Sequence, residues 1–155
     1  MPTPHYLVAT DFSPNSVEAL QQAIADAQQS GARVTLLHVV PQANGLRDLD
    51  SIGYLHQASQ YPATPEPADM QHIHRQFASQ LAETKPQLSE VETALRSGNP
   101  ATEIVQFAKD QDVRAIYVGA SSSSSRLYRL LASVSDHILQ KAQCRVIAVR
   151  SAAAR

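Results

Sequence analysis

Short apolar runs alternate along the chain with stretches in which apolar residues recur every three or four positions. Val17, Leu20 and Ile24 lie at spacings of three and four, which puts them on one face of a helix. The near-continuous apolar run at 34–40 is instead typical of a strand that is covered on both faces. The pattern predicts five strands, at 6–10, 34–40, 91–96, 113–118 and 146–149, and four helices, which contain 14–30, 70–81, 100–108 and 127–138.

Two helix starts carry strong local signals. Ser13 is a helix N-cap residue followed by Pro14, and Asn99 with Pro100 repeats the same arrangement. Gly31 follows the first periodic segment and suits the left-handed position that ends a helix. These signals place a helix directly after the first strand and another directly after the third.

Five strands that alternate with four helices indicate a doubly wound α/β fold, with a parallel sheet and two helices on each face. The 155 residues fit a single domain over 1–155. Residues 42–67 hold three prolines, two glycines and no apolar period, so we expect a long, mobile loop there. In such sheets ligands bind at the carboxyl ends of the strands beside the point where the strand order reverses. If the order is 3-2-1-4-5, the loops at 11–13 and from Gly119 onward meet at that point.

Composition narrows the classes of function. The chain has 13 basic and 14 acidic residues, whereas a protein that coats nucleic acid is strongly basic. Its one cysteine, Cys144, excludes an intrachain disulfide. No apolar run reaches the ~20 residues that span a bilayer, and residues 1–5 do not resemble a secretory leader. We therefore expect a cytoplasmic domain with no nucleic-acid or membrane partner.

The loop after Gly119 is the first candidate for chemistry. Five serines, 121–125, separate a strand from a helix, and Arg126 and Arg129 follow them. Unpaired N–H groups at a helix start favour an anion, and the hydroxyls and guanidinium groups add donors. The segment is either a phosphate cradle or a solvated polar turn.

Asp11 ends the first strand and is the second candidate. Its carboxylate could accept a nucleotide amino group or help to hold a divalent ion, or it could cap the following helix in an Asx turn. His72 and His74 are two positions apart on a helix and make a poor metal pair. His38, in an apolar strand, is interpreted as a core or rim histidine with satisfied hydrogen bonds. No catalytic residue and no metal site is predicted, because no nucleophile elbow or P-loop sequence is present.

Five segments together resemble the universal stress protein family over residues 4–150. They are residues 7–13, 36–41, 97–101, the stretch from 117 to 135, and 144–149. The resemblance implies a Rossmann-like fold with strand order 3-2-1-4-5. It also implies a homodimer, which we expect to form through the apolar last strand, an open sheet edge.

Members of that family that bind ATP carry three glycines and a hydroxyl residue after the fourth strand. In this chain the first glycine is Gly119 and the hydroxyl is Ser133, but Ser122 and Ala132 stand at the other two glycine positions. A serine that needs φ > 0 costs about 1–2 kcal/mol, and the alanine adds a methyl group near the phosphates. The nucleotide-binding loop is therefore degenerate.

By resemblance, Asp11 and Val39 would meet the ribose and adenine, while Gly119, Ser122 and Ser133 would lie at the phosphates. Arg126 is added because its charge lies beside the same helix start. The cofactor would be ATP or another adenine nucleotide, with Mg. Two hypotheses follow. The first is a non-catalytic, cytoplasmic stress-response module with an altered nucleotide site. The second is an ATP-binding switch, capable of slow hydrolysis, that uses the serine-rich loop.

Overall fold

The computed structural model describes residues 2–41, 67–84, 91–120 and 137–150. Its elements, in chain order, are β1 (His5–Thr10), α1 (Pro14–Ser30), β2 (Arg33–Pro41), α3 (Pro67–Thr84), β3 (Val91–Gly98), α4 (Pro100–Asp110), β4 (Ala115–Ala120) and β5 (Arg145–Arg150). A helical segment at 137–141 precedes β5. All of the mobile loop expected over 42–67 except Pro67, and most of the helix expected at 127–138, lie outside these ranges.

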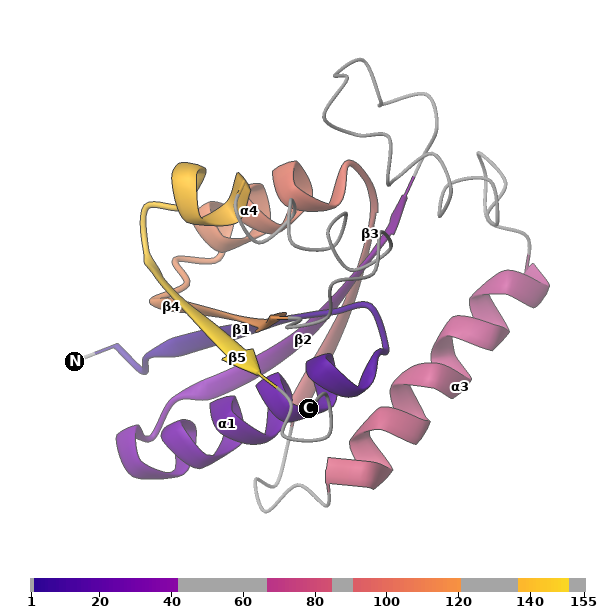
Figure 1. Ribbon diagram of the computed structural model, residues 1–155, viewed down its shortest axis with the longest axis horizontal. Coiled ribbons are helices and arrows are strands. Elements are labelled where there is room, and N and C mark those ends of the chain that lie inside the picture. Colours follow the sequence, from indigo (N-terminus) through magenta and orange to yellow (C-terminus); the bar gives the residue numbers. More distant parts are fainter. Residues whose placement is uncertain (1, 42–66, 85–90, 121–136, 151–155) are drawn as a thin grey trace.

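The sheet has five parallel strands in the order β3-β2-β1-β4-β5, which confirms the expected fold class (Figure 1). β1 lies in the centre, where it pairs with β2 through Thr10 and His38 and with β4 through Ala9 and Val118. The order therefore reverses between β1 and β4. The carboxyl ends of these two strands form the edge at which such folds bind ligands.

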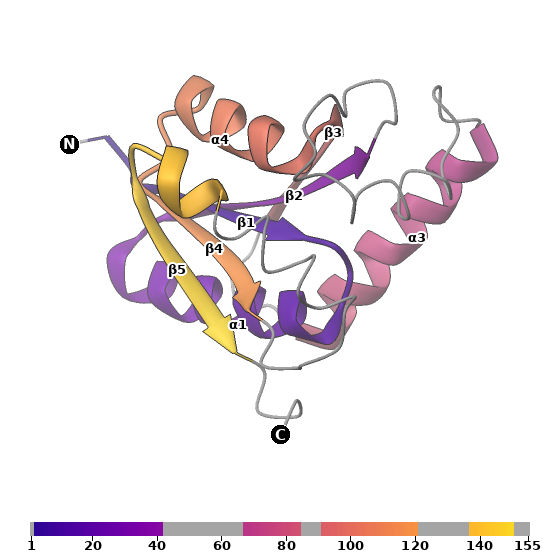
Figure 2. The same ribbon diagram turned by 45° about the horizontal axis from the view of Figure 1, so that its top comes forward.

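Alternate residues of the central strands face opposite layers. Val8 and Leu36 are fully buried toward α1 and α3, whereas Leu7 and Leu37 are fully buried toward α4. Figures 1 and 2 show α1 and α3 on one face of the sheet and α4 with the segment at 137–141 on the other. Within that segment Ile138 is fully buried, so the described residues agree with helices on both faces.

The helix ends follow the local signals. The Ser13 side chain accepts a hydrogen bond from the Ser16 N–H, and Gly31 ends α1 at φ 73°. The Asn99 side chain accepts from the Thr102 N–H, 3.2 Å away, at the start of α4. These contacts satisfy backbone groups that a helix end otherwise leaves unpaired.

The strands differ from their predicted ranges by one or two residues at their ends, and the fourth strand differs at both ends. The fourth strand begins at Ala115 instead of Val113, because the Val113 N–H bonds to the Ala108 carbonyl and completes the turn that ends α4. The strand also continues through Gly119 to Ala120, since both residues pair with β5. α3 begins at Pro67, at the helix position where a proline loses no hydrogen bond, so Pro67 belongs to this helix and not to the loop expected over 42–67.

Candidate functional site

The edge at the reversal point is built from the ends of β1, β2 and β4. The last residue of β1, Thr10, pairs with His38 of β2, so Asp11 and Val39 each lie one residue beyond this pair. Across β1, Ala9 pairs with Val118, and Gly119 follows. The topology thus brings three of the six predicted site residues to one edge. The other three, Ser122, Arg126 and Ser133, lie outside the described residues.

Asp11 is exposed and begins the turn that leads into α1. Its Oδ1 accepts hydrogen bonds from the Ser13 N–H, 2.9 Å away, and from the Ser16 hydroxyl, 2.5 Å away. The Ser16 hydroxyl oxygen in turn accepts from the Asp11 N–H at 3.2 Å. One carboxylate oxygen therefore forms the Asx turn that the sequence left open as an alternative. The second oxygen, Oδ2, takes part in neither bond.

Gly119 is in close contact with the first turn of α1. A Cβ atom at this position would lie 2.7 Å from both the carbonyl carbon and the Cβ of Asn15. Any larger residue would therefore push α1 away from β4. Because Asp11 bonds to Ser16 in the same helical turn, the turn joins the two candidate loops and fixes their relative position.

Val39 is the residue that was expected, with Asp11, to meet the ribose and adenine. Its side chain is 6% exposed and is buried in the apolar layer that faces α4. The side chain therefore supports the sheet and offers little contact surface to a ligand.

A buried cluster behind Asp11 was not predicted. The Thr10 hydroxyl donates to Gln80 Oε1 on α3 at 2.7 Å, and His38 Nδ1 lies 2.8 Å from the Thr10 carbonyl oxygen. Phe12 adopts φ 64°, a left-handed conformation that is rare for a bulky residue. Its ring lies 4.4 Å from that of His38 and 5.1 Å from that of Phe77, between centroids. The available sequence signal was Gln80, a polar residue on the apolar face of its helix.

His38 is 6% exposed. Burial lowers its pKa below the usual value, an effect opposed by its hydrogen bond to Thr10 and by the negative charge of Asp11. The neutral ring donates through Nδ1, while Nε2 is buried without a hydrogen-bond partner. The sequence therefore predicted the burial of His38 correctly. It was wrong to expect that both ring nitrogens form hydrogen bonds.

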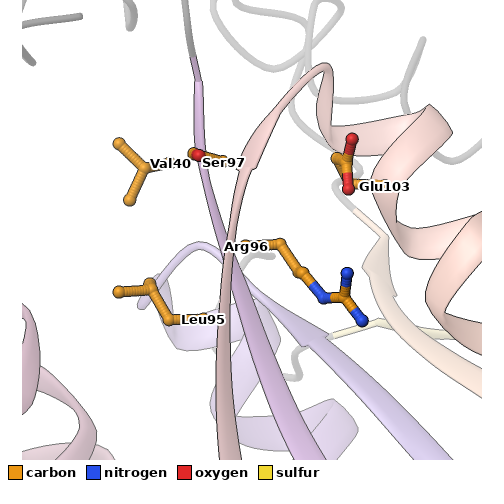
Figure 3. Close-up of a pocket in the computed structure, with 5 residues that line it drawn as sticks. All are labelled: Val40, Leu95, Arg96, Ser97 and Glu103. Carbon is orange, nitrogen blue, oxygen red and sulfur yellow. The ribbon is translucent and has the colours of Figure 1, made fainter. Parts of the chain in front are cut away.

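A pocket of about 350 Å³ lies beside this edge, at the ends of β2 and β3. Figure 3 shows Val40 and Leu95 on one side of the strands and Arg96 and Glu103 on the other. The Arg96 guanidinium carbon lies 5.2 Å from the ring centroid of Phe107, which holds the cation against α4. None of the predicted site residues that the structure describes, Asp11, Val39 and Gly119, lines this pocket.

The weaker candidates are isolated in the structure. His72 and His74 are exposed on α3, and Cys144 is half-buried, with a thiol pKa that burial raises. The described ranges contain no group of three or more His, Cys, Asp or Glu side chains that could hold a metal ion. Within the same ranges, no helix has the length and apolar content needed to cross a membrane.

A parallel, doubly wound sheet with an accessible edge at its reversal point defines a Rossmann-like α/β domain. The chain belongs to the universal stress protein family, whose family model matches residues 4–150. It is 30% identical over 149 residues to universal stress protein YxiE of Bacillus subtilis, an alignment that covers 93% of this chain and 97% of that protein. The resemblance found in the sequence is thereby confirmed.

Solved structures of the same family share the fold. The universal stress protein UspA from Lactobacillus plantarum superposes with a TM-score of 0.70 at 20% identity, covering 97% of this chain and 99% of that one. A universal stress protein in complex with cAMP gives a TM-score of 0.67 at 19% identity, with 96% and 98% covered. One from Archaeoglobus fulgidus in complex with dAMP gives 0.66 at 21% identity, also with 96% and 98% covered.

Proposed function

We propose that this chain is a non-catalytic stress-response module that binds an adenine nucleotide weakly at the carboxyl edge between β1 and β4. The observation that carries the proposal is the junction of Asp11 and Gly119 through the first turn of α1. It joins an exposed carboxylate to the start of the serine-rich loop at the place where such sheets bind nucleotides. The cAMP and dAMP complexes of two structural neighbours support the choice of ligand.

Asp11 and Val39 are assigned to the nucleoside. Asp11 Oδ2 is the oxygen that its turn does not use, and it would accept a hydrogen from a ribose hydroxyl or from the adenine amino group. Val39 would contribute its main chain, because its side chain is buried. This division leaves the Asx turn intact when the nucleotide binds.

The segment from Gly119 onward is assigned to the phosphates. The Ser122 and Ser133 hydroxyls and the Arg126 guanidinium would donate to phosphate oxygens, with Mg neutralising further charge. Since Ser122 and Ala132 replace two glycines of the family motif, we expect a Kd in the micromolar to millimolar range, or about −8 to −4 kcal/mol. Asp11 Oδ1 already accepts two hydrogen bonds, which suits ligand positioning better than general-base catalysis.

Calorimetric titration with dAMP, AMP and Mg-ATP tests the proposal, and Asp11→Asn is its sharpest variant. Asparagine retains an acceptor oxygen for the turn but places an N–H₂ donor where Oδ2 was. We expect binding about tenfold weaker or worse, with the free energy of unfolding nearly unchanged. Ser122→Gly combined with Ala132→Gly should tighten Mg-ATP binding. No binding by the unmodified chain, or equal binding by Asp11→Asn, would overturn the assignment, and steady ADP release would overturn its non-catalytic part.

The partner that we propose is a second copy, paired along β5. This strand ends the sheet, and its Val146, Ile147 and Val149 are only half-buried. An open strand edge with apolar side chains invites pairing. Sedimentation at micromolar concentration should show a dimer, with Arg150 at its rim. Ala148→Arg places a charged side chain at the exposed centre of β5 and should dissociate it, whereas a monomeric wild type or an unaffected dimer would refute this interface.

A cytoplasmic location is part of the same proposal. The chain's single cysteine fits a reducing compartment, where disulfides do not contribute to stability.

A further inference from the structure

α3 contacts the loop that carries Asp11 through one buried hydrogen bond. The Thr10 hydroxyl oxygen accepts from the Phe12 N–H, 2.9 Å away, and the hydroxyl donates its single hydrogen to Gln80 Oε1 at 2.7 Å. Thr10 and Gln80 are 6% and 3% exposed, so water does not compete for this bond. Gln80 thereby fixes the rotation of the hydroxyl that in turn orients the backbone of Phe12.

The residues on both sides of Asp11 contact the same side chain, His38. Before it, the Thr10 carbonyl accepts from His38 Nδ1 at 2.8 Å. After it, the ring of Phe12 contacts His38 and also Phe77, which belongs to α3 like Gln80. Phe12 has φ 64°, a conformation that persists in a bulky residue only where surrounding contacts impose it.

The stability of the fold alone does not explain why polar side chains are buried where α3 packs against the ends of β1 and β2. Gln80 Nε2 and His38 Nε2 are buried without hydrogen-bond partners, and so is Oε1 of Gln76, one turn earlier on α3. Each unpaired buried group costs free energy that an apolar side chain of the same shape would avoid. Gln80 differs from Gln76 in that it bonds to the Asp11 loop.

We propose that Gln80 is a positioning residue for the nucleotide site: its hydrogen bond to Thr10 sets the backbone at Phe12, directly after Asp11, and so controls nucleotide affinity from α3. The effect on affinity rests on the proposed function, because it requires a nucleotide at Asp11. Gln80 acts through Thr10 and makes no contact with the ligand.

The test uses Gln80→Met, with Gln76→Met as the matched control on the same helix face. Methionine keeps the unbranched shape of glutamine and removes the amide. Gln80→Met should weaken dAMP binding about three- to tenfold, the range expected for one lost hydrogen bond, and accelerate hydrogen exchange at the Phe12 amide. Its unfolding midpoint in urea should lie below that of Gln76→Met, because Gln80→Met also leaves the buried Thr10 hydroxyl without its acceptor. Gln76→Met should leave affinity and Phe12 exchange unchanged.

A double-mutant cycle combines Gln80→Met with Thr10→Val. Because Thr10→Val removes the hydroxyl through which Gln80 acts, Gln80→Met should have no further effect on affinity or on Phe12 exchange in the Thr10→Val background. Additive effects, or equal effects of Gln80→Met and Gln76→Met, would overturn the inference. If the unmodified chain binds no dAMP, the proposed function fails and the effect on affinity fails with it. Phe12 exchange in the four variants would still decide whether Gln80 positions the loop.

Discussion

Replacing Gly119 by alanine should loosen the junction between β4 and α1. The added Cβ would lie 2.7 Å from two carbon atoms of Asn15, and ordinary contacts begin at 3.4 Å. The helix must therefore retreat by about 0.7 Å, because one of the two atoms belongs to its backbone. Such overpacking costs about 1–3 kcal/mol. For a chain of 155 residues, each kcal/mol lowers the melting temperature by about 2–4 °C.

Calorimetric and urea-induced unfolding measure this loss of stability. Variants at Gly31 serve as the comparison. Gly31 has open space around its Cβ position but φ 73°, so Gly31→Ala is destabilised by backbone conformation alone and Gly31→Asn should recover much of the loss. At Gly119 the volume of the added side chain causes the loss, so Gly119→Asn should have a lower free energy of unfolding than Gly119→Ala. A Gly119→Ala protein within about 0.5 kcal/mol of the unmodified chain would refute the steric argument, since that is the range of neutral surface changes.

Three further predictions concern single contacts. Burial lowers the pKa of His38 in the folded state, so the native protein binds fewer protons than the unfolded chain, and the free energy of unfolding should fall as pH drops below about 6.5. Urea titrations at pH 7.5 and 5.5 should show a smaller difference for His38→Gln. Tyr117→Phe removes a 2.6 Å hydrogen bond to Asp26 and should cost about 1–2 kcal/mol in chemical unfolding. Asn99→Ala removes the N-cap of α4 and should cost about 1 kcal/mol by the same assay.

The predictable parts of the fold are those whose cause is local. Ser13 with Pro14 and Asn99 with Pro100 determine where α1 and α4 begin, because the capping side chain and the N–H that it accepts from are three residues apart. The strand order came from the family resemblance, since apolar runs alone do not say which neighbour each strand takes. Strand ends were the weakest predictions: Ala120 is in β4 because β5 pairs with it.

The site was predictable only in outline. Asp11 and Gly119 stand at strand ends, and the topology brings them to one edge. The bond between Thr10 and Gln80 joins residues 70 positions apart, and no periodicity encodes which residue of a helix meets which strand end. The left-handed φ of Phe12 likewise has no sequence signal, because phenylalanine has no preference for that conformation and the contacts that impose it come from β2 and α3.

Amide NMR titration with dAMP tests whether an adenine nucleotide binds at the edge between β1 and β4. The largest shifts should occur at Asp11, Ser16 and Gly119, and Asp11→Asn should abolish most of them. Shifts centred on Ser97 and Glu103 would move the ligand to the pocket beside β3, and no shifts at millimolar dAMP would contradict nucleotide binding altogether.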